Sequence, residues 1–148
     1  MFPLVQLLLV EDDEVEAEFV RRSLQHHGGK YVLRTVPDGL AALQVLRGQA
    51  GQPRLCRPYI ILLDLNLPRL GGLEFLHALR QDPDLKHAVV FVRTTSNLER
   101  DKLAAYSYQI AGYCLKTADN VNCSKIFDLL DAYCTVVAFP REKALIGV

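Results

Sequence analysis

Residues 59–72, YIILLDLNLPRLGG, decide the fold of this chain. The first five residues of the stretch are all apolar and include β-branched members, which predicts a strand buried on both faces. The strand ends in a lone carboxylate, Asp64, and Asn66, Pro68 and a Gly pair follow it as turn-forming residues. A carboxylate at the C-terminal end of such a strand lies on the rim of the sheet, where open α/β sheets bind ligands. A single Asp in this place can also cap a turn, but a second acidic group near the start of the chain favours a site.

Length and charge limit the possible functions. The chain has 148 residues, enough for one domain, and half of them are apolar, as in a compact globular protein. Its 17 basic and 17 acidic side chains balance, so no overall field attracts nucleic acid or an anionic membrane. The opening MFPLVQLLLV lacks the basic residues of a signal peptide and reaches Glu11 too soon for a membrane span. We therefore expect a cytoplasmic protein with one domain at 1–136, a tail at 137–148, and neither nucleic acid nor membrane as a partner.

Apolar runs and helically spaced segments alternate along the whole chain. Strands are predicted at 5–10, 31–36, 59–63, 88–92 and 112–115. Helices are predicted at 14–26, 38–47, 72–81, 97–110 and 122–136, with Asp38 and Asn97 as candidate N-caps. Five such alternations imply an α/β fold with a parallel sheet. We expect the flavodoxin-like, doubly wound (βα)5 arrangement with strand order 2-1-3-4-5.

Charged and hydroxyl side chains follow several predicted strands, at the point where each strand ends. Glu11 and Asp12 follow the first strand, Asp64 the third, Thr94 the fourth and Lys116 the fifth. In the order 2-1-3-4-5 the first and third strands are neighbours, so Glu11, Asp12 and Asp64 converge. Three carboxylates in one cleft repel one another at pH 7 unless a cation shares them, and oxygen ligands of this kind suit Mg²⁺. The sequence therefore predicts a magnesium site at this edge of the sheet.

A phosphoryl group fits such a site. Mg²⁺ attracts phosphate, and with the metal present the Asp64 carboxylate can attack a phosphoryl group as a nucleophile. The Lys116 amine and the Thr94 hydroxyl can bind the equatorial phosphoryl oxygens, whose charge must be stabilised. The predicted product is an acyl phosphate on Asp64.

The ordered set of these residues resembles the receiver domains of bacterial two-component response regulators, of the single-domain type to which the chemotaxis regulator belongs. The resemblance covers about residues 5–135. It rests on the acidic pair Glu11-Asp12, on Asp64 with Leu65, Asn66 and Pro68, on Gly72, on Thr94 and on Lys116. The family implies a signalling protein that accepts phosphate on its own Asp and has no substrate turnover of its own, hence no enzyme.

The resemblance implies a role for each site residue. Asp64 is similar to the phosphoacceptor of the family, and Asp12 and the backbone carbonyl of Asn66 are similar to its metal ligands. Glu11 resembles the residue that binds the metal through water. Lys116 corresponds to the lysine that contacts the phosphoryl group. Mg²⁺ is accordingly the expected cofactor.

The resemblance also implies partners and a switch. The phosphoryl donor of such a protein is a sensor histidine kinase. The segments DLNLP, DPDLK and VRTTS are similar to those of small regulators that partner cyanobacterial bacteriophytochromes, which suggests a phytochrome as the kinase. Thr94 and Tyr113 resemble the switch pair, which would alter a protein-interaction face after phosphorylation. No output domain is expected, so the output would be contact with another protein.

Two positions depart from the family pattern. Thr117 stands where the family usually has Pro after Lys116. A cis bond before Thr117 would cost about 3 kcal/mol more than a trans bond, so we expect Lys116–Thr117 to be trans. Arg93 stands where an apolar residue is usual, and we expect it to point to the rim or toward a partner. Neither change removes a residue of the phosphorylation site.

Three other interpretations fit parts of the pattern. A haloacid-dehalogenase-type phosphatase also uses an Asp after a strand, but it needs a second Asp where this chain has Asn66. A flavodoxin shares the topology, but the acidic run that starts at Glu11 would repel the flavin phosphate from the first loop. The third interpretation, an adaptor that keeps the fold and works without phosphorylation, stays open.

The predicted fourth helix, fifth strand and fifth helix carry more aromatic side chains than the edge of a small domain usually needs. The apolar and aromatic residues of this region and of the tail are Tyr106, Tyr108, Ile110, Tyr113, Phe127, Tyr133, Val137, Phe139, Leu145 and Ile146. Exposed apolar surface of this extent commonly marks an interface. We expect a homodimer through this face. The alternative is that the tail folds back and covers the face within one chain.

Overall fold

Five strands and five helices alternate along the part of the chain that the structure describes, as the sequence predicts. The computed structural model describes residues 5–28, 31–118 and 121–142. The strands are β1 (Val5–Val10), β2 (Tyr31–Val36), β3 (Tyr59–Leu63), β4 (Val89–Thr94) and β5 (Gly112–Leu115). The helices are α1 (Glu14–His27), α2 (Gly39–Arg47), α3 (Gly72–Gln81), α4 (Glu99–Ser107) and α5 (Val121–Val136).

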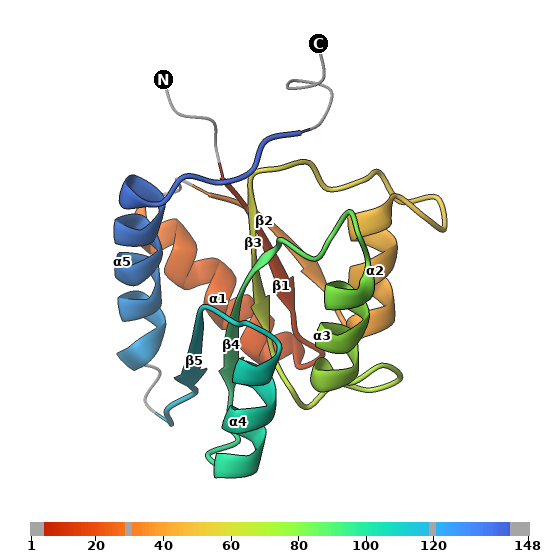
Figure 1. Cartoon of the computed structure of the whole chain (residues 1–148). Coiled ribbons are helices and arrows are strands. Elements are labelled where there is room, and N and C mark those ends of the chain that lie inside the picture. Colours follow the sequence, from red (N-terminus) through yellow and green to blue (C-terminus); the bar gives the residue numbers. More distant parts are fainter. Residues whose placement is uncertain (1–4, 29–30, 119–120, 143–148) are drawn as a thin grey trace.

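The strands form one parallel sheet in the order β2-β1-β3-β4-β5, which confirms the predicted doubly wound fold. Helices α1 and α5 cover one face of the sheet, and α2 and α3 cover the other (Figure 1). The strand order reverses between β1 and β3, where Val10 pairs directly with Leu63. The residues that follow these two strands are therefore neighbours at the carboxyl edge of the sheet.

β3 is buried along its whole length, as its apolar sequence predicts. Ile61 and Leu63 belong to the hydrophobic cluster under α2 and α3, which also contains the fully buried Phe75. Ile60 belongs to the cluster under α1 and α5, around Phe127. Because burying each such side chain contributes about 1.5–3 kcal/mol, the two clusters hold the central strands and fix where their ends lie.

Two glycines allow the connection after β3 to pack closely against its neighbours. A Cβ atom at Gly72 would lie 2.6 Å from the Leu65 Cα and 2.7 Å from the Asp64 carbonyl oxygen. A Cβ atom at Gly39 would lie 2.7 Å from the carbonyl oxygen of Leu70, which accepts a hydrogen bond from the Gly39 N–H. Helices α2 and α3 therefore both begin against the loop that follows Asp64, and this close packing determines the path of the loop.

The structure corrects the predicted junction between β4 and α4. β4 continues to Thr94, beyond its predicted end at residue 92. The N-cap of α4 is Leu98, so the prediction that Asn97 caps this helix is wrong. The Ser96 hydroxyl instead accepts a hydrogen bond from the Leu98 N–H at 3.4 Å and donates one to the Asp101 carboxylate at 2.5 Å. Ser96 lies three residues before the first residue of the helix, and no side chain of the described residues makes an N-cap hydrogen bond to α4.

Arg80, near the end of α3, binds the two chain segments that lead into β4 and β5. Its guanidinium donates to four backbone carbonyls, those of Lys86, Ala88, Tyr108 and Gln109, at 2.7–3.0 Å. The first two carbonyls lie just before β4, and the other two lie just before β5. A single side chain therefore fixes how the chain approaches both strands.

The first part of the tail folds back within the chain. Residues 137–142 run across the amino ends of the strands, away from α4 (Figure 1). Phe139 packs against Tyr133 with ring centroids 5.9 Å apart. The Glu142 carboxylate accepts hydrogen bonds from the Arg54 guanidinium at 2.7 Å and from the Arg57 N–H at 2.6 Å. This segment therefore closes the amino edge of the sheet and leaves α4 uncovered.

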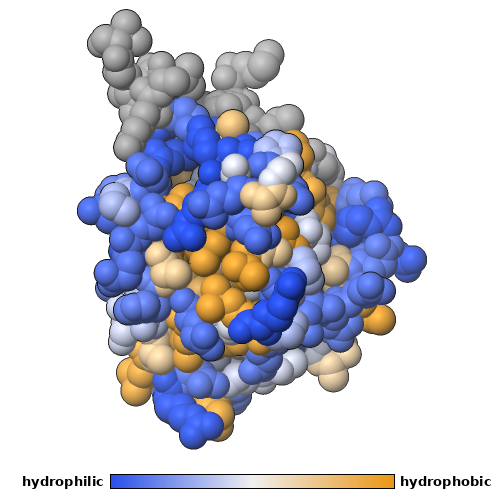
Figure 2. Space-filling model, turned by 90° about the vertical axis from the view of Figure 1, so that its right-hand side faces the viewer, coloured by the Kyte–Doolittle hydropathy of each residue, from blue (hydrophilic) through white to orange (hydrophobic). Residues whose placement is uncertain are grey.

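The surface is mostly hydrophilic, with an apolar region on the side of α2 and α3. Figure 2 shows apolar atoms gathered in the middle of this side, with hydrophilic residues around them. Leu40 of α2 is exposed, and Leu70 and Leu73 are half-buried against the core beneath. No helix in the described ranges is long and apolar enough to cross a membrane.

Candidate functional site

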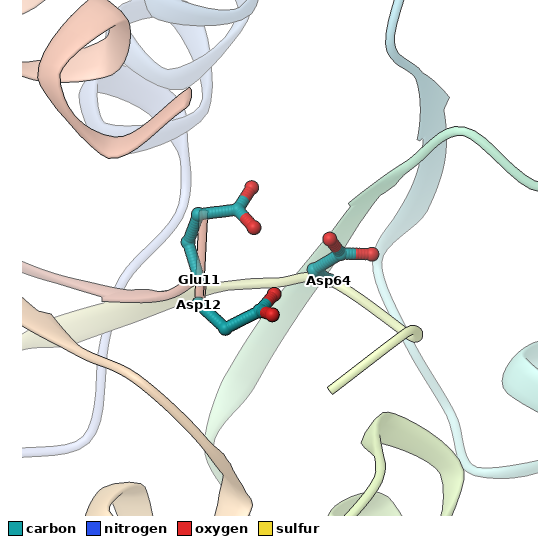
Figure 3. A group of neighbouring side chains, drawn as sticks. All are labelled: Glu11, Asp12 and Asp64. Carbon is teal, nitrogen blue, oxygen red and sulfur yellow. The ribbon is translucent and has the colours of Figure 1, made fainter. Parts of the chain in front are cut away.

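Glu11, Asp12 and Asp64 come together at the carboxyl edge of the sheet, as the strand order predicts. The pairing of β1 with β3 continues past the strand ends, because the Asp64 N–H donates to the Val10 carbonyl at 3.1 Å. One carboxylate oxygen from each of the three acids lies within 4.8 Å of the others. Figure 3 shows the three acids beside one another, with the Asp12 carboxylate extended toward Asp64.

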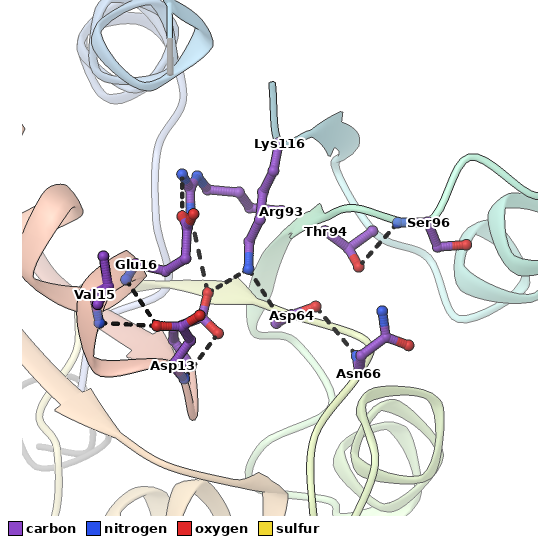
Figure 4. A network of polar contacts seen from close by, with 10 residues as sticks. Asp13, Val15, Glu16, Asp64, Asn66, Arg93, Thr94, Ser96 and Lys116 are labelled. Atoms are coloured by element: carbon purple, nitrogen blue, oxygen red, sulfur yellow. Dashed lines mark hydrogen bonds and ion pairs between the residues drawn. The ribbon is translucent and has the colours of Figure 1, made fainter. Parts of the chain in front are cut away.

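Lys116 bridges two of these carboxylates. Its Nζ donates to Glu11 Oε1 at 2.5 Å and to Asp64 Oδ2 at 2.9 Å (Figure 4). Glu11 and Asp64 are buried, whereas Asp12 is exposed. The site therefore has a buried part, in which a lysine offsets two acids, and an open part on the side of Asp12.

The backbone beside Lys116 holds the lysine in place without a following proline. The Lys116 N–H donates to the Thr94 carbonyl at 2.8 Å, which extends the pairing of β5 with β4. The Lys116–Thr117 peptide bond is trans, as predicted, since Arg57–Pro58 is the only cis bond in the part of the chain that the structure describes. With Thr117 in place of the usual Pro, the Lys116 amine therefore still reaches Asp64.

Burial changes the proton affinities of the site. Glu11 is 3% exposed, and this burial raises the pKa of its carboxyl to about 7, although the hydrogen bond from Lys116 lowers it. Burial also acts against the charge of Lys116, but its hydrogen bonds to Glu11 and Asp64 outweigh that effect and raise the pKa of the lysine. Lys116 is therefore charged at pH 7, while burial disfavours the ionised form of Glu11.

The donor atoms of the cluster fit a divalent cation. Carboxylate oxygens are hard ligands, of the kind that Mg²⁺ and Mn²⁺ prefer. Asn66, predicted to add its carbonyl oxygen, lies in the loop after β3, and its N–H donates to Asp64 Oδ1 at 3.1 Å. Arg69 holds this loop, since its Nε donates at 2.8 Å to Asp38, a buried carboxylate that also caps α2.

Thr94 and Tyr113, the predicted switch pair, both contact Ser96. Thr94 is fully buried, and its hydroxyl accepts a hydrogen bond from the Ser96 N–H at 3.5 Å. The Tyr113 hydroxyl donates to the Ser96 carbonyl at 2.8 Å. Because the Ser96 hydroxyl also bonds to Asp101 of α4, this residue connects the two predicted switch side chains to the start of that helix. The sequence interpretation placed Ser96 among the hydroxyls that follow the fourth strand but gave it no role, because its contacts are with Tyr113 and Asp101, which no local pattern links to it.

Arg93 is buried and reaches the acids at the rim, so of the two expected directions it takes the one toward the rim and does not point toward a partner. Its side chain is 4% exposed and lies among the acids of β1 and α1. The Nη2 atom donates to Glu16 Oε2 at 3.0 Å, and Nη1 lies 4.0 Å from Glu11 Oε1 (Figure 4). The alternation of β4 could have shown this, because Arg93 lies two residues from Phe91, which packs under α1 and α5.

This fold, with an acidic cluster and a lysine at its carboxyl edge, belongs to a known class of signalling proteins. The model of the response regulator receiver domain family matches residues 7–128, and the chain belongs to this family. The response regulator Rcp1 of Synechocystis sp. is 35% identical over 127 residues, which are 86% of each protein. The probable methanogenesis regulatory protein FilR2 of Methanothrix harundinacea is 36% identical over 110 residues, 74% of this chain and 70% of that one.

Solved structures show the same relationship. The Mn²⁺-bound form of Rcp1 superposes with a TM-score of 0.78 at 34% identity, over 92% of this chain and 99% of that one. The phosphorylated cyanobacterial phytochrome response regulator RcpA superposes with a TM-score of 0.82 at 30% identity, over 93% and 98% of the two chains. The chain is thus a receiver-type response regulator of two-component signalling, which implies a histidine kinase partner, and its family is not a family of enzymes. Its acidic cluster could hold a divalent cation, and the Rcp1 structure to which the chain is similar is a Mn²⁺-bound form.

Proposed function

We propose that this protein is a single-domain response regulator that accepts a phosphoryl group on Asp64, with Mg²⁺ as cofactor, from a sensor histidine kinase. The observation that carries the proposal is the position of Asp64. It follows β3, which lies between the strand that brings Glu11 and Asp12 and the strands that bring Thr94 and Lys116. Asp64 is therefore the carboxylate that can face the acids on one side and the phosphoryl-binding groups on the other.

The transfer needs one nucleophile and charge stabilisation around it. An Asp64 carboxylate oxygen attacks the phosphorus of the phosphohistidine, a P–O bond forms, the P–N bond breaks, and the imidazole leaves with the bonding electron pair. Lys116, now 2.9 Å from Asp64, exchanges this contact for a phosphoryl oxygen and offsets its negative charge. Asp12, Asp64 and the Asn66 carbonyl would hold Mg²⁺, with Glu11 acting through water. The bound cation supplies positive charge that attracts the phosphoryl group and balances the acids.

Thr94 and Tyr113 are proposed to pass the phosphorylation state to α4. A phosphoryl oxygen on Asp64 offers the Thr94 O–H a charged acceptor, and a turn of the side chain toward it would draw the hydroxyl oxygen away from the Ser96 N–H that it now accepts from. Loss of the 3.5 Å contact with Ser96 would loosen the loop that also holds the Tyr113 hydroxyl and the start of α4. The size of this coupling depends on how differently the two states bind the phosphoryl group.

The output is proposed to act through the face made by α4, β5 and α5, with a homodimer as one form of it. Leu98, Leu103 and Tyr106 are exposed on the α4 side, and Leu103 is 68% exposed. Tyr133 and Phe139 do not add to this face, because they pack on each other within the chain. The predicted contributions of Leu145 and Ile146 lie outside the described residues. The exposed side chains of α4 therefore carry the proposal.

The histidine kinase is proposed to be a phytochrome. The support is the 35% identity with Rcp1 and the similarity to RcpA, which is described as a cyanobacterial phytochrome response regulator. With this assignment, and because the charges of the chain balance, we propose that the protein is cytoplasmic and contacts neither nucleic acid nor membrane.

Intact mass after incubation with acetyl phosphate and Mg²⁺ tests the phosphorylation site. We expect the wild-type chain to gain one phosphoryl group and Asp64→Asn to gain none. Asp13→Asn is the matched control, because Asp13 caps α1 beside the site and Asn caps a helix equally well. Labelling of Asp64→Asn at the wild-type rate would show that the assignment is wrong. A wild-type chain that takes up no phosphate, from acetyl phosphate or from a kinase, would instead support the phosphorylation-independent adaptor.

A further inference from the structure

Arg93 is a buried cation that the proposed phosphoryl transfer does not use. Its guanidinium lies beneath the acidic cluster, between Glu16 of α1 and Glu11 after β1, and Figure 4 shows it reaching away from Asp64 toward α1. Nη2 is hydrogen-bonded to Glu16, but the buried Nη1 has no hydrogen-bond partner among the described residues. A guanidinium held in this way, with a donor unused, is costly unless nearby negative charge compensates for it.

Glu11 provides part of that negative charge. The same atom, Glu11 Oε1, lies 2.5 Å from Lys116 Nζ and 4.0 Å from Arg93 Nη1. Glu11 therefore stands between two cations, one on the side of Asp64 and the other on the side of α1. The Arg93 guanidinium therefore adds a second positive charge to the surroundings of Glu11, besides that of Lys116.

We propose that Arg93 is a built-in counter-cation of the acidic cluster, which weakens the binding of Mg²⁺ by adding positive charge beside the metal ligands. The proposal rests on the metal site of the proposed function and does not need phosphorylation to occur. Its physical basis is that a divalent ion entering the cluster is attracted by Glu11, Asp12 and Asp64 and repelled by Lys116 and Arg93.

Glu16 determines how strongly Arg93 acts on the site. Its carboxylate takes the direct hydrogen bond and so offsets part of the guanidinium charge, but it lies at the edge of the fold, with 26% of its side chain exposed. Solvent weakens the compensation at such a position. Because Glu16 thus cancels the Arg93 charge only in part, the guanidinium still repels a cation at the site, and we expect its removal to tighten Mg²⁺ binding by about tenfold.

Calorimetric titration of the unphosphorylated full chain with Mg²⁺ tests the proposal. Arg93→Met keeps the length of the side chain and removes the charge, and we expect its Kd for Mg²⁺ to fall about tenfold. Arg93→Lys keeps the charge, and its Kd should stay within about twofold of wild type. A residue that only supported the fold would give the opposite sign, because disturbing the cluster would weaken metal binding. An Arg93→Met Kd equal to or higher than that of wild type overturns the proposal.

Glu16→Gln tests the same proposal by removing the partly exposed partner of Arg93. This variant replaces Arg93→Met in the test if Arg93→Met does not fold. Without the Glu16 charge, the positive charge of Arg93 is no longer compensated and repels the cation more strongly. The Kd for Mg²⁺ should therefore rise several-fold. Glu14→Gln is its matched control, since Glu14 is an exposed acid in the same turn of α1 and the variant has the same net charge. If Glu16→Gln binds Mg²⁺ no more weakly than Glu14→Gln, the proposal fails. Phosphate uptake is measured separately, so tight Mg²⁺ binding without uptake would count against the phosphoryl transfer and not against the role of Arg93.

Discussion

The buried carboxyl of Glu11 should make the stability of this protein depend on pH in a window that few surface acids affect. The pKa of Glu11 is raised from 4.5 to about 7 in the folded chain, with burial as the main cause. In the unfolded chain the carboxyl has its ordinary pKa. Between these two values the folded protein therefore binds the proton and the unfolded protein does not. The contribution of Glu11 to the free energy of unfolding should accordingly be fully present below pH 4.5, fall as the pH rises to about 7, and change no further above that.

The size of the effect follows from the same two values. The difference between 4.5 and about 7, multiplied by about 1.36 kcal/mol for each pH unit, gives about 3 kcal/mol. Glu11→Gln cannot ionise and should lack this contribution. The unfolding free energy of wild type minus that of Glu11→Gln should therefore fall by about 3 kcal/mol between pH 4 and pH 8.

Urea unfolding followed by circular dichroism, in buffers with a chelator, measures this difference at each pH. Glu74→Gln on the exposed surface of α3 is the control, and its difference from wild type should stay flat over the window. Saturating Mg²⁺ should move the fall to lower pH, because a bound cation stabilises the ionised form of Glu11. A Glu11→Gln difference that is constant or rises with pH would refute the reasoning.

Two further predictions concern the contribution of Arg80 to the stability of the fold and the proposed dimer interface. Arg80→Met leaves four backbone carbonyls without their donor and should lower the unfolding free energy by about 3 kcal/mol or more. Urea unfolding checks this, and Arg47→Met, which loses a more exposed pair with Asp82, should cost less than about 1 kcal/mol. Sedimentation at micromolar concentration should show a wild-type dimer that Leu103→Lys converts to a monomer, while Leu40→Lys on α2 stays dimeric. Monomers throughout, before and after phosphorylation, would contradict the proposed interface.

Local patterns in the sequence were enough to predict the fold. The apolar run of β3, the turn residues behind Asp64 and the regular alternation of strand and helix each depend on neighbouring residues, so they can be identified without a structure. The convergence of Glu11, Asp12 and Asp64 could also be predicted, because strand order alone places the ends of β1 and β3 side by side. The element ends were predicted less well, because Asn97 was chosen as the cap of α4 where Leu98 is the N-cap residue and its N–H bonds to Ser96.

What only the tertiary structure decided is which distant side chains pair. Arg93 and Glu16 are 77 positions apart, and no local pattern connects them. The alternation of β4 assigns Arg93 to a face of the sheet, but whether a long cation reaches solvent or a buried acid depends on how α1 packs over that face. Lys116 likewise could have pointed into solvent, and it contacts Glu11 because three strands bring their ends together. The sequence thus determined the strands, the helices and the rim residues, whereas the packing of elements far apart in the chain determined the charge balance of the site.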